Sequence, residues 1–334
     1  MKEPLRRRAG ALLVDGFFRG AARAGASIPL ADPSRHGVEV LRDIPYREGG
    51  RPEHQLDIWR PTNRPGPYPV VLYLHGGGFR ICSKETHWIF GLIFARRGYL
   101  VVNASYRLAP AHRWPAAHED AASALLWTLR EVVRYGGDPS RLVIAGESAG
   151  ANLAASMAIA ASYRRPETWA REIFASGASP SAVFAACGIY QVSDTARFRR
   201  AAGTSWFIQD RLSEVEDAYL PPAYAAPDAP ALHDPLLVLE EGRPPERPLA
   251  PFFAPVGTWD PLVDDTRRLE RALGKLGVPC EARYYERAIH AFHAFIFDRN
   301  ARRCWVDAFG FLRPLVGAGE VAPGAPDPWS SKRH

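Results

Sequence analysis

Cysteine is scarce in this sequence, and the few that occur are scattered. The 334 residues contain four cysteines, and no two of them form a C-x-x-C pair. This argues against a disulfide framework and against a zinc site, both of which need characteristic spacings. The histidines show no ligand spacing either, and no H-E-x-x-H segment occurs. We therefore expect no metal and no cofactor, and interpret the cysteines as small buried side chains in a reducing compartment.

Long apolar runs are also missing. The longest run without a charged residue, 173–193, contains several serines and a glutamine, which does not fit a membrane span. Near the N-terminus, three arginines precede an apolar stretch that Asp15 interrupts. That stretch is shorter than the apolar region of a signal peptide, about 7–15 residues. We expect a cytoplasmic protein with no stable membrane insertion.

Lysine is nearly absent, although basic residues are not. Only four of the 42 lysines and arginines are lysine, and the net charge is +6. An arginine-rich, alanine-rich chain can follow from genome composition alone, so this charge is weak evidence for an anionic partner. We expect no nucleic-acid partner, whose mark would be binding that weakens steeply with salt.

The composition otherwise indicates a globular chain. Thirty prolines and 28 glycines are too few for a low-complexity or collagen-like protein. With 47% hydrophobic residues, a chain of this size can bury the core of one large domain or two modest ones.

From residue 68 onward, short apolar runs alternate with helix-length amphipathic segments. The pattern predicts strands at 68–74, 100–104, 142–145, 182–189, 251–256 and 281–285. It predicts helices at 118–135, 149–161, 265–276 and 301–316. Such alternation is typical of an α/β protein with a mostly parallel sheet covered by helices on both faces.

Two regions break the alternation. Residues 1–36 carry one apolar stripe that includes Leu12, Leu13 and Phe17, opposite several arginines. Residues 191–247 are proline-rich and hold an isolated helix, for which Ser213 and Glu216 predict a capping box. Neither region has enough apolar residues for a core of its own. The tail after Gly317 is predicted to be disordered.

The segment Gly146-Glu147-Ser148-Ala149-Gly150 matches G-x-S-x-G. It follows one predicted strand and opens one predicted helix, and a serine at such a turn projects its hydroxyl from the sheet edge. The helix N-terminus would also favour a developing anion. Taken alone, the segment fits a glycine-rich strand–helix loop equally well.

A second motif favours a nucleophilic serine. His75-Gly76-Gly77-Gly78-Phe79 follows the strand predicted at 68–74, and consecutive glycines expose main-chain N–H groups to an oxyanion. A phosphate loop is the rival interpretation, but no G-K-[ST] follows.

Together these motifs resemble the α/β-hydrolase fold and, within it, the hormone-sensitive-lipase-like carboxylesterases of bacterial family IV. The resemblance covers about residues 40–316 and includes the run Tyr106-Arg107-Leu108-Ala109-Pro110. Gly257-Thr258-Trp259-Asp260-Pro261-Leu262 resembles the family's G-x-x-D-P-L segment. Glu286-Arg287-Ala288-Ile289-His290-Ala291-Phe292 resembles its E-G-x-x-H-G-F segment.

The resemblance implies a catalytic triad of Ser148, Asp260 and His290, in the chain order that this fold uses. It also implies an oxyanion hole from the amides of Gly76, Gly77 and Ala149. Asp260 and His290 both follow predicted parallel strands, so they would emerge at the same sheet edge as Ser148.

Each supporting role has a competitor. His293 is the alternative base, but the spacing from Glu286 favours His290. Asp264 and Asp265 are alternative acids, but their place at the start of a helix predicts capping. His75 is expected to shape the oxyanion loop without titrating in catalysis.

The sequence departs from the family pattern in four places. Ala291 and Arg287 stand where the family has glycine, so positive φ there would be costly, which leaves the path of the His290 loop open. Ser105 stands where Asp is common before Tyr-Arg, and Glu147 stands where Asp is commoner before the nucleophile. None of these changes removes a catalytic group.

The resemblance also implies a helical cap over the active site. We divide the chain into an N-terminal cap segment (1–40), the first part of the hydrolase core (41–190), a cap insertion (191–247), the second part of the core (248–317) and the tail (318–334). Aromatic side chains available for the substrate pocket are Phe79, Trp88, Trp206 and Phe207, each of which could equally be core.

The function expected is a serine carboxylesterase that hydrolyses small-molecule esters with short- to medium-chain acyl groups. An acyl hydrolase acting on amides, lactones or thioesters shares the same triad and stays open. A non-catalytic small-molecule receptor on this fold would usually lack the serine or histidine, and both are present. The sequence also leaves a homodimer open.

Overall fold

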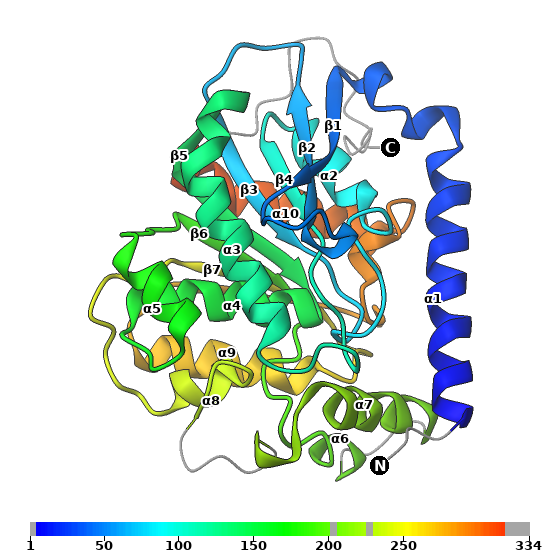
Figure 1. Ribbon diagram of the computed structural model, residues 1–334, viewed down its shortest axis with the longest axis vertical. Helices are drawn as coiled ribbons and strands as arrows, with labels where there is room; N and C mark the ends of the chain where they lie inside the picture. The colour runs from blue at the N-terminus through cyan, green and yellow to red at the C-terminus, as the bar shows by residue number, and fades with distance from the viewer. Residues whose placement is uncertain (1–4, 201–205, 225–229, 318–334) are drawn as a thin grey trace.

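The computed structural model describes residues 5–200, 206–224 and 230–317, which build a central sheet with helices on both faces (Figure 1). The strands are β1 (Val38–Pro45), β2 (Gln55–Pro61), β3 (Tyr68–Leu74), β4 (Leu100–Ala104), β5 (Gly137–Glu147), β6 (Ala182–Ala186), β7 (Phe252–Gly257) and β8 (Cys280–Tyr285). Their order is β1-β2-β4-β3-β5-β6-β7-β8. The β1–β2 and β2–β4 pairs are antiparallel and the others are parallel. The predicted α/β fold with a mostly parallel sheet is confirmed.

The helices divide between the two faces of the sheet. The described helices are α1 (Leu5–Ala26), α2 (Trp88–Ala95), α3 (Ala116–Glu131), α4 (Ala149–Ser162), α5 (Thr168–Ala175), α6 (Arg197–Arg200), α7 (Trp206–Tyr219), α8 (Pro235–Glu240), α9 (Val263–Lys275) and α10 (Arg299–Val316). One core cluster lies under α3, α4, α5, α8 and α9, and a second lies under α2 and α10. Strands β3 and β4 are buried along their whole length, as expected for strands covered on both faces.

Several elements differ from the expectation. Strands β3 and β4 occupy the predicted residues, whereas β5 begins five residues earlier than expected, at Gly137. Strands β1 and β2 and helices α2, α5 and α8 were not predicted. The capping box at Ser213 is wrong, because α7 already begins at Trp206. The Glu216 carboxylate instead accepts from the amide of Thr195 at 2.8 Å.

Helix α1 stands along one side of the molecule, with its N-terminal end beside α7 (Figure 1). Two contacts attach it to α2 and to the loop before α2: Trp88 Nε1 donates to the Ala22 carbonyl at 3.1 Å, and the Cys82 amide donates to Asp15 at 3.1 Å. The side chains of Leu12, Leu13 and Phe17 lie outside the part of the structure that is described, as does the tail 318–334. None of the described helices is both long and apolar enough to cross a membrane.

Candidate active site

The site forms where neighbouring parallel strands end. Ser148 directly follows β5, Asp260 lies three residues after β7, and His290 lies five residues after β8. The carboxyl ends of parallel strands share one edge of a sheet, which is where α/β proteins place their ligands. The structure therefore brings the three predicted triad residues to one edge.

Ser148 sits on a strained turn between β5 and α4, with φ 53° and ψ −116°. The glycines on either side are required by crowding. A Cβ on Gly146 would lie 2.3 Å from the Gly150 carbonyl oxygen, and a Cβ on Gly150 would lie 2.0 Å from that of Leu74. This is the geometry that the G-x-S-x-G motif needs in order to present its hydroxyl.

His290 is paired with Asp260. Its Nδ1 lies 2.9 Å from Asp260 Oδ2, and the other carboxylate oxygen accepts the Leu262 amide at 2.8 Å. Burial of the ring favours the neutral form, but the charges and hydrogen bonds of Asp260 and Cys187 together outweigh it and raise the pKa of His290 well above its ordinary value. The Asp260 side chain is inaccessible, whereas 37% of the His290 side chain is exposed. The imidazole can therefore be oriented from behind while its other nitrogen faces a substrate.

His293, the alternative base, lies elsewhere. It is fully buried, and its Nε2 lies 2.9 Å from Glu147 Oε2. The loop that carries both histidines has left-handed backbone at Arg287 (φ 57°) and Ala291 (φ 55°). Two non-glycine residues thus adopt the conformation that glycine takes without penalty, at a cost of roughly 1 kcal/mol each.

Asp264 and Asp265, the alternative acids, do not cap α9 as predicted. The N-cap is Leu262, and it makes no side-chain capping hydrogen bond. Asp264 is exposed and pairs with Arg267 at 2.7 Å. Asp265 is buried and instead accepts hydrogen bonds from backbone amides outside α9.

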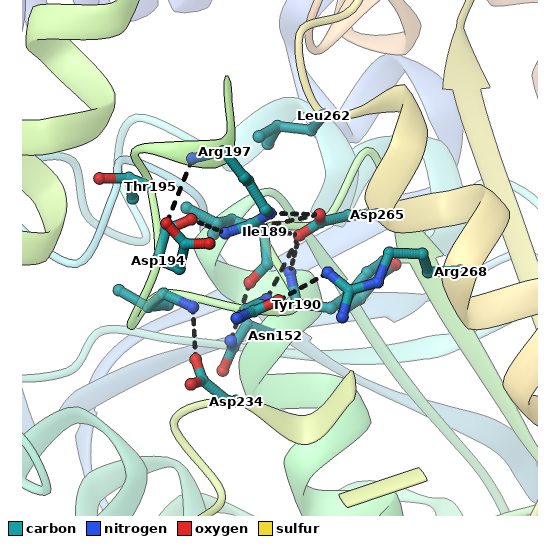
Figure 2. A network of polar contacts seen from close by, with 12 residues as sticks. Asn152, Ile189, Tyr190, Asp194, Thr195, Arg197, Asp234, Leu262, Asp265 and Arg268 are labelled. Carbon is teal, nitrogen blue, oxygen red and sulfur yellow. Dashed lines mark hydrogen bonds and ion pairs between the residues drawn. The ribbon is translucent and has the colours of Figure 1, made fainter. Parts of the chain in front are cut away.

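Figure 2 shows that Asp265 fixes the segment leading out of β6. It accepts the amides of Tyr190 at 2.8 Å and Gln191 at 3.2 Å, and pairs with Arg197 at 2.7 Å. Asp234 accepts the amides of Val192 and Ser193 in the same way. Two buried carboxylates therefore hold residues 190–193, the start of the segment that continues to α7.

Two glycines of the oxyanion loop have positive φ and no room for a side chain. A Cβ on Gly77 (φ 108°) would lie 2.3 Å from the Ile81 carbonyl oxygen, and one on Gly78 (φ 60°) would lie 2.7 Å from Val215 Cγ2. The N–H of Gly76 is aimed at His87 Nε2, at 3.3 Å, inside the loop. Gly78, in contrast, lines the same cavity as Ser148.

Glu147, next to the nucleophile, is a buried carboxylate between two histidines. Its Oε1 lies 2.8 Å from His87 Nε2. Burial opposes ionisation, but the hydrogen bonds from His293 and His87 dominate and hold the pKa of Glu147 well below its usual range. An ionised carboxylate at 2.8 Å requires the proton on His87 Nε2, so in this tautomer that nitrogen cannot accept the N–H of Gly76. Burial and nearby His87 lower the pKa of His75 to about 3, so this ring stays neutral.

The cavity in front of Ser148 has a volume of about 430 Å³ and mainly apolar walls. Its lining includes Leu212 and Val215 of α7 together with Trp259 and Ile289. Trp259 and Ile289 are also exposed, at 66% and 53%. These four side chains were not singled out as pocket residues from the sequence.

The predicted pocket aromatics lie elsewhere or are not described. Phe79 is buried and stacks on Tyr219 at 3.9 Å, and Trp88 packs toward α1. Neither lines the cavity of Ser148. The side chains of Trp206 and Phe207 lie outside the described residues.

One further side chain at this edge escaped the sequence analysis. Cys187 directly follows β6, between the strands that carry Ser148 and Asp260, and it is fully buried. Its thiol, the Asp260 carboxylate and a His290 ring nitrogen all lie within 4.8 Å of one another. No motif marks this cysteine, so only the strand order could have revealed it.

Known proteins resemble this chain in both sequence and structure. A family described as having the alpha/beta hydrolase fold matches residues 71–294. Carboxylesterase NlhH of Mycobacterium tuberculosis is 40% identical over 123 residues, which cover 36% of this chain and 35% of that protein. Esterase LipQ of the same species is 38% identical over 136 residues, covering 40% of this chain and 32% of that protein. Each match thus spans about a third of the relative.

Solved structures match over most of the chain. A bacterial heroin esterase superposes with a TM-score of 0.72 and 26% identity, covering 89% of this chain and 90% of that one. An esterase of Pyrobaculum calidifontis gives a TM-score of 0.71 and 26% identity, covering 91% and 92%. The likeness therefore extends over the sheet and the helices on both of its faces.

Proposed function

Because this chain belongs to the α/β-hydrolase fold family, we propose that it is a serine carboxylesterase acting through Ser148, His290 and Asp260. The observation that carries the proposal is the 2.9 Å contact between His290 and Asp260, with His290 lining the same cavity as Ser148. The esterase names of the relatives and structural neighbours support the same reaction class.

In the first half-reaction, His290 removes the Ser148 proton as the hydroxyl oxygen attacks the ester carbonyl carbon. The carbonyl oxygen becomes an oxyanion. We assign its stabilisation to the amides of Gly77, Gly78 and Ala149, with Gly78 in place of the Gly76 expected from the sequence, because Gly78 lines the cavity of Ser148. Asp260 keeps the imidazole in the required tautomer and stabilises the imidazolium.

Collapse of the tetrahedral intermediate expels the alcohol, which takes its proton from His290, and leaves an acyl-Ser148 ester. In the second half-reaction His290 removes a proton from water, and the hydroxide attacks the acyl carbon. The acid then leaves and Ser148 recovers its proton from His290.

The cavity favours esters with short- to medium-chain acyl groups, since its walls are apolar and its volume is about 430 Å³. We assign the cap role to α1 and to the segment that includes α7, because α7 contributes Leu212 and Val215 to that wall. Cytoplasmic location and a homodimer stay predictions. Amide, lactone and thioester substrates use the same groups and are decided by assay.

The test is a series of aryl esters of increasing acyl length, assayed with the wild type and with Ser148→Ala. We expect hydrolysis that peaks at short to medium chains and is lost in the variant. A fluorophosphonate probe should label the peptide that contains residues 146–150. Full activity in Ser148→Ala, or labelling elsewhere, would contradict the proposal. No turnover of any ester by a folded, labelled protein would favour the other acyl substrates.

A further inference from the structure

Four adjacent strands each deliver one reactive side chain to the same edge of the sheet. In the order β5, β6, β7 and β8 these are Ser148, Cys187, Asp260 and His290. The proposed esterase reaction uses three of these side chains and gives no role to Cys187. The cysteine is held in place by its own amide, which donates to the Pro255 carbonyl at 2.9 Å, with a left-handed φ of 40°.

The position of Cys187 makes it the third donor of a compact set. Its sulfur, one Asp260 carboxylate oxygen and one His290 ring nitrogen lie within 4.8 Å of one another. Thiolate, imidazole and carboxylate are the ligands that Zn²⁺ takes in proteins, at about 2.0–2.3 Å in tetrahedral sites. Three such ligand atoms this close together resemble a metal site more than a chance contact between core side chains.

Asp260 is inaccessible and has only one cationic partner in the described part of the chain, the His290 ring. A divalent ion bound to the three side chains would displace the protons of the thiol and of the imidazole to solvent, and the buried carboxylate would neutralise part of its charge.

We propose that Cys187, Asp260 and His290 form an inhibitory site for a thiophilic divalent cation such as Zn²⁺ or Cd²⁺. The cation binds the Cys187 thiolate, an Asp260 oxygen and a His290 nitrogen, and water fills the position that faces the cavity. The His290 side chain, 37% exposed, is the entry point. The inhibitory consequence rests on the proposed function: an imidazole bound to a metal cannot accept the Ser148 proton.

The direct test is a Cd²⁺ titration of the full-length chain, followed by the ultraviolet charge-transfer band of a cadmium thiolate. We expect one equivalent to develop the band in the wild type, in Ser148→Ala and in the control Cys280→Ala. Cys280 is a suitable control because it is the least buried of the four thiols. The band should be absent in Cys187→Ala and in Cys187→Ser, the second variant guarding against a folding defect.

The second readout is inhibition of ester hydrolysis by Zn²⁺, reversed by a chelator. Each variant is compared with its own metal-free rate, and the inhibiting concentration should rise at least ~10-fold in Cys187→Ser. The proposal is overturned if the wild type shows no band, if the band persists without Cys187, or if it disappears in Cys280→Ala instead. A normal band in a protein without esterase activity would refute the proposed function and leave the cation site standing.

Discussion

The floor of the active site and the helix above it are built from different kinds of contact. The floor consists of strand ends and tight turns, where Gly146, Gly150 and Gly77 have no room for a side chain. Helix α7, in contrast, is attached mainly through side chains, with one backbone hydrogen bond from the Trp114 amide to the Tyr219 carbonyl at 2.9 Å. Arg80 pairs with Glu214, and Tyr219 stacks on Phe79 at 3.9 Å.

This difference separates chemistry from selectivity. Backbone constraints hold Ser148 and the oxyanion loop in one geometry, which catalysis requires to a fraction of an ångström. Side-chain contacts tolerate exchange, so Leu212 and Val215 can vary in size without disturbing the floor. We therefore expect changes in the floor to affect kcat, and changes in α7 to affect which acyl chain is preferred.

The largest effect should come from His290→Ala. Removing the base from a triad costs about 10⁴–10⁶-fold in kcat, while the fold should persist because the side chain is partly exposed. His293→Ala is the matched control and should retain far more activity, with loss of stability from the cavity it leaves. An inactive His293→Ala variant together with an active His290→Ala variant would show that His293 is the base.

Asp260→Asn should come next, with a loss of about 10⁴-fold through the wrong histidine tautomer. The Asp260 charge raises the pKa of His290, so its removal should lower that pKa. The acidic limb of the kcat/KM profile should then shift to lower pH, which a pH series of residual activity measures. Asp264→Asn, an exposed control, should leave both rate and pH profile unchanged.

Glu147→Gln tests whether the floor depends on one buried charge. Glu147 contacts His87, which lies against the oxyanion loop, and His293, three residues after the catalytic histidine, so its loss should misplace both. We expect kcat to fall about 10²-fold and the free energy of unfolding to fall by about 3 kcal/mol at neutral pH. The exposed Glu172→Gln on α5 serves as the control.

The pH dependence of that stability loss has a defined sign. The pKa of Glu147 is lowered in the folded state, so its stabilising effect is complete above its unfolded value of about 4.3 and declines below it. The difference in unfolding free energy between the wild type and Glu147→Gln should therefore shrink as the pH falls below that value. A difference that stays constant in denaturant titrations across this range would show that the charge is not what stabilises the floor.

Val215→Ala should have the smallest effect and should act on selectivity alone. The change opens space beside Gly78, where Val215 Cγ2 now closes the cavity. Each additional buried methylene is worth about 0.8 kcal/mol, so kcat/KM for longer acyl esters should rise a few-fold relative to acetate. Val133→Ala, at an exposed position, is the control. An unchanged chain-length profile would show that α7 does not contact the acyl chain of the substrate.

Periodicity predicted the strands from β3 to β8 and failed at the margin formed by β1 and β2. Strands β3 and β4 are continuous apolar runs, and both occur at the predicted residues. Strands β1 and β2 carry charged residues and lie at one side of the sheet, so their apolar pattern is broken. Helix α2 is apolar on all sides because it packs on the sheet and its Phe94 also packs against Trp305 and Phe309 of α10. No amphipathic period therefore marked it as a helix.

The sequence by itself determined what depends on neighbouring residues in the chain. Local motifs predict the turns of the active site. These are the glycines around Ser148 and after His75, and the segments around Asp260 and His290. The central strands are equally local, since an unbroken apolar run needs no partner to be recognised.

Only the tertiary structure decided which distant side chains meet. Sheet order placed Cys187 between the strands that carry Ser148 and Asp260, and folding joined His87, Glu147 and His293 in one buried cluster. Folding also placed Val215 and Ile289 in the cavity wall, whereas Phe79 is buried against Tyr219. The physical reason is the same in each case. Packing brings together residues from separate strands and loops, and no spacing along the chain records those contacts.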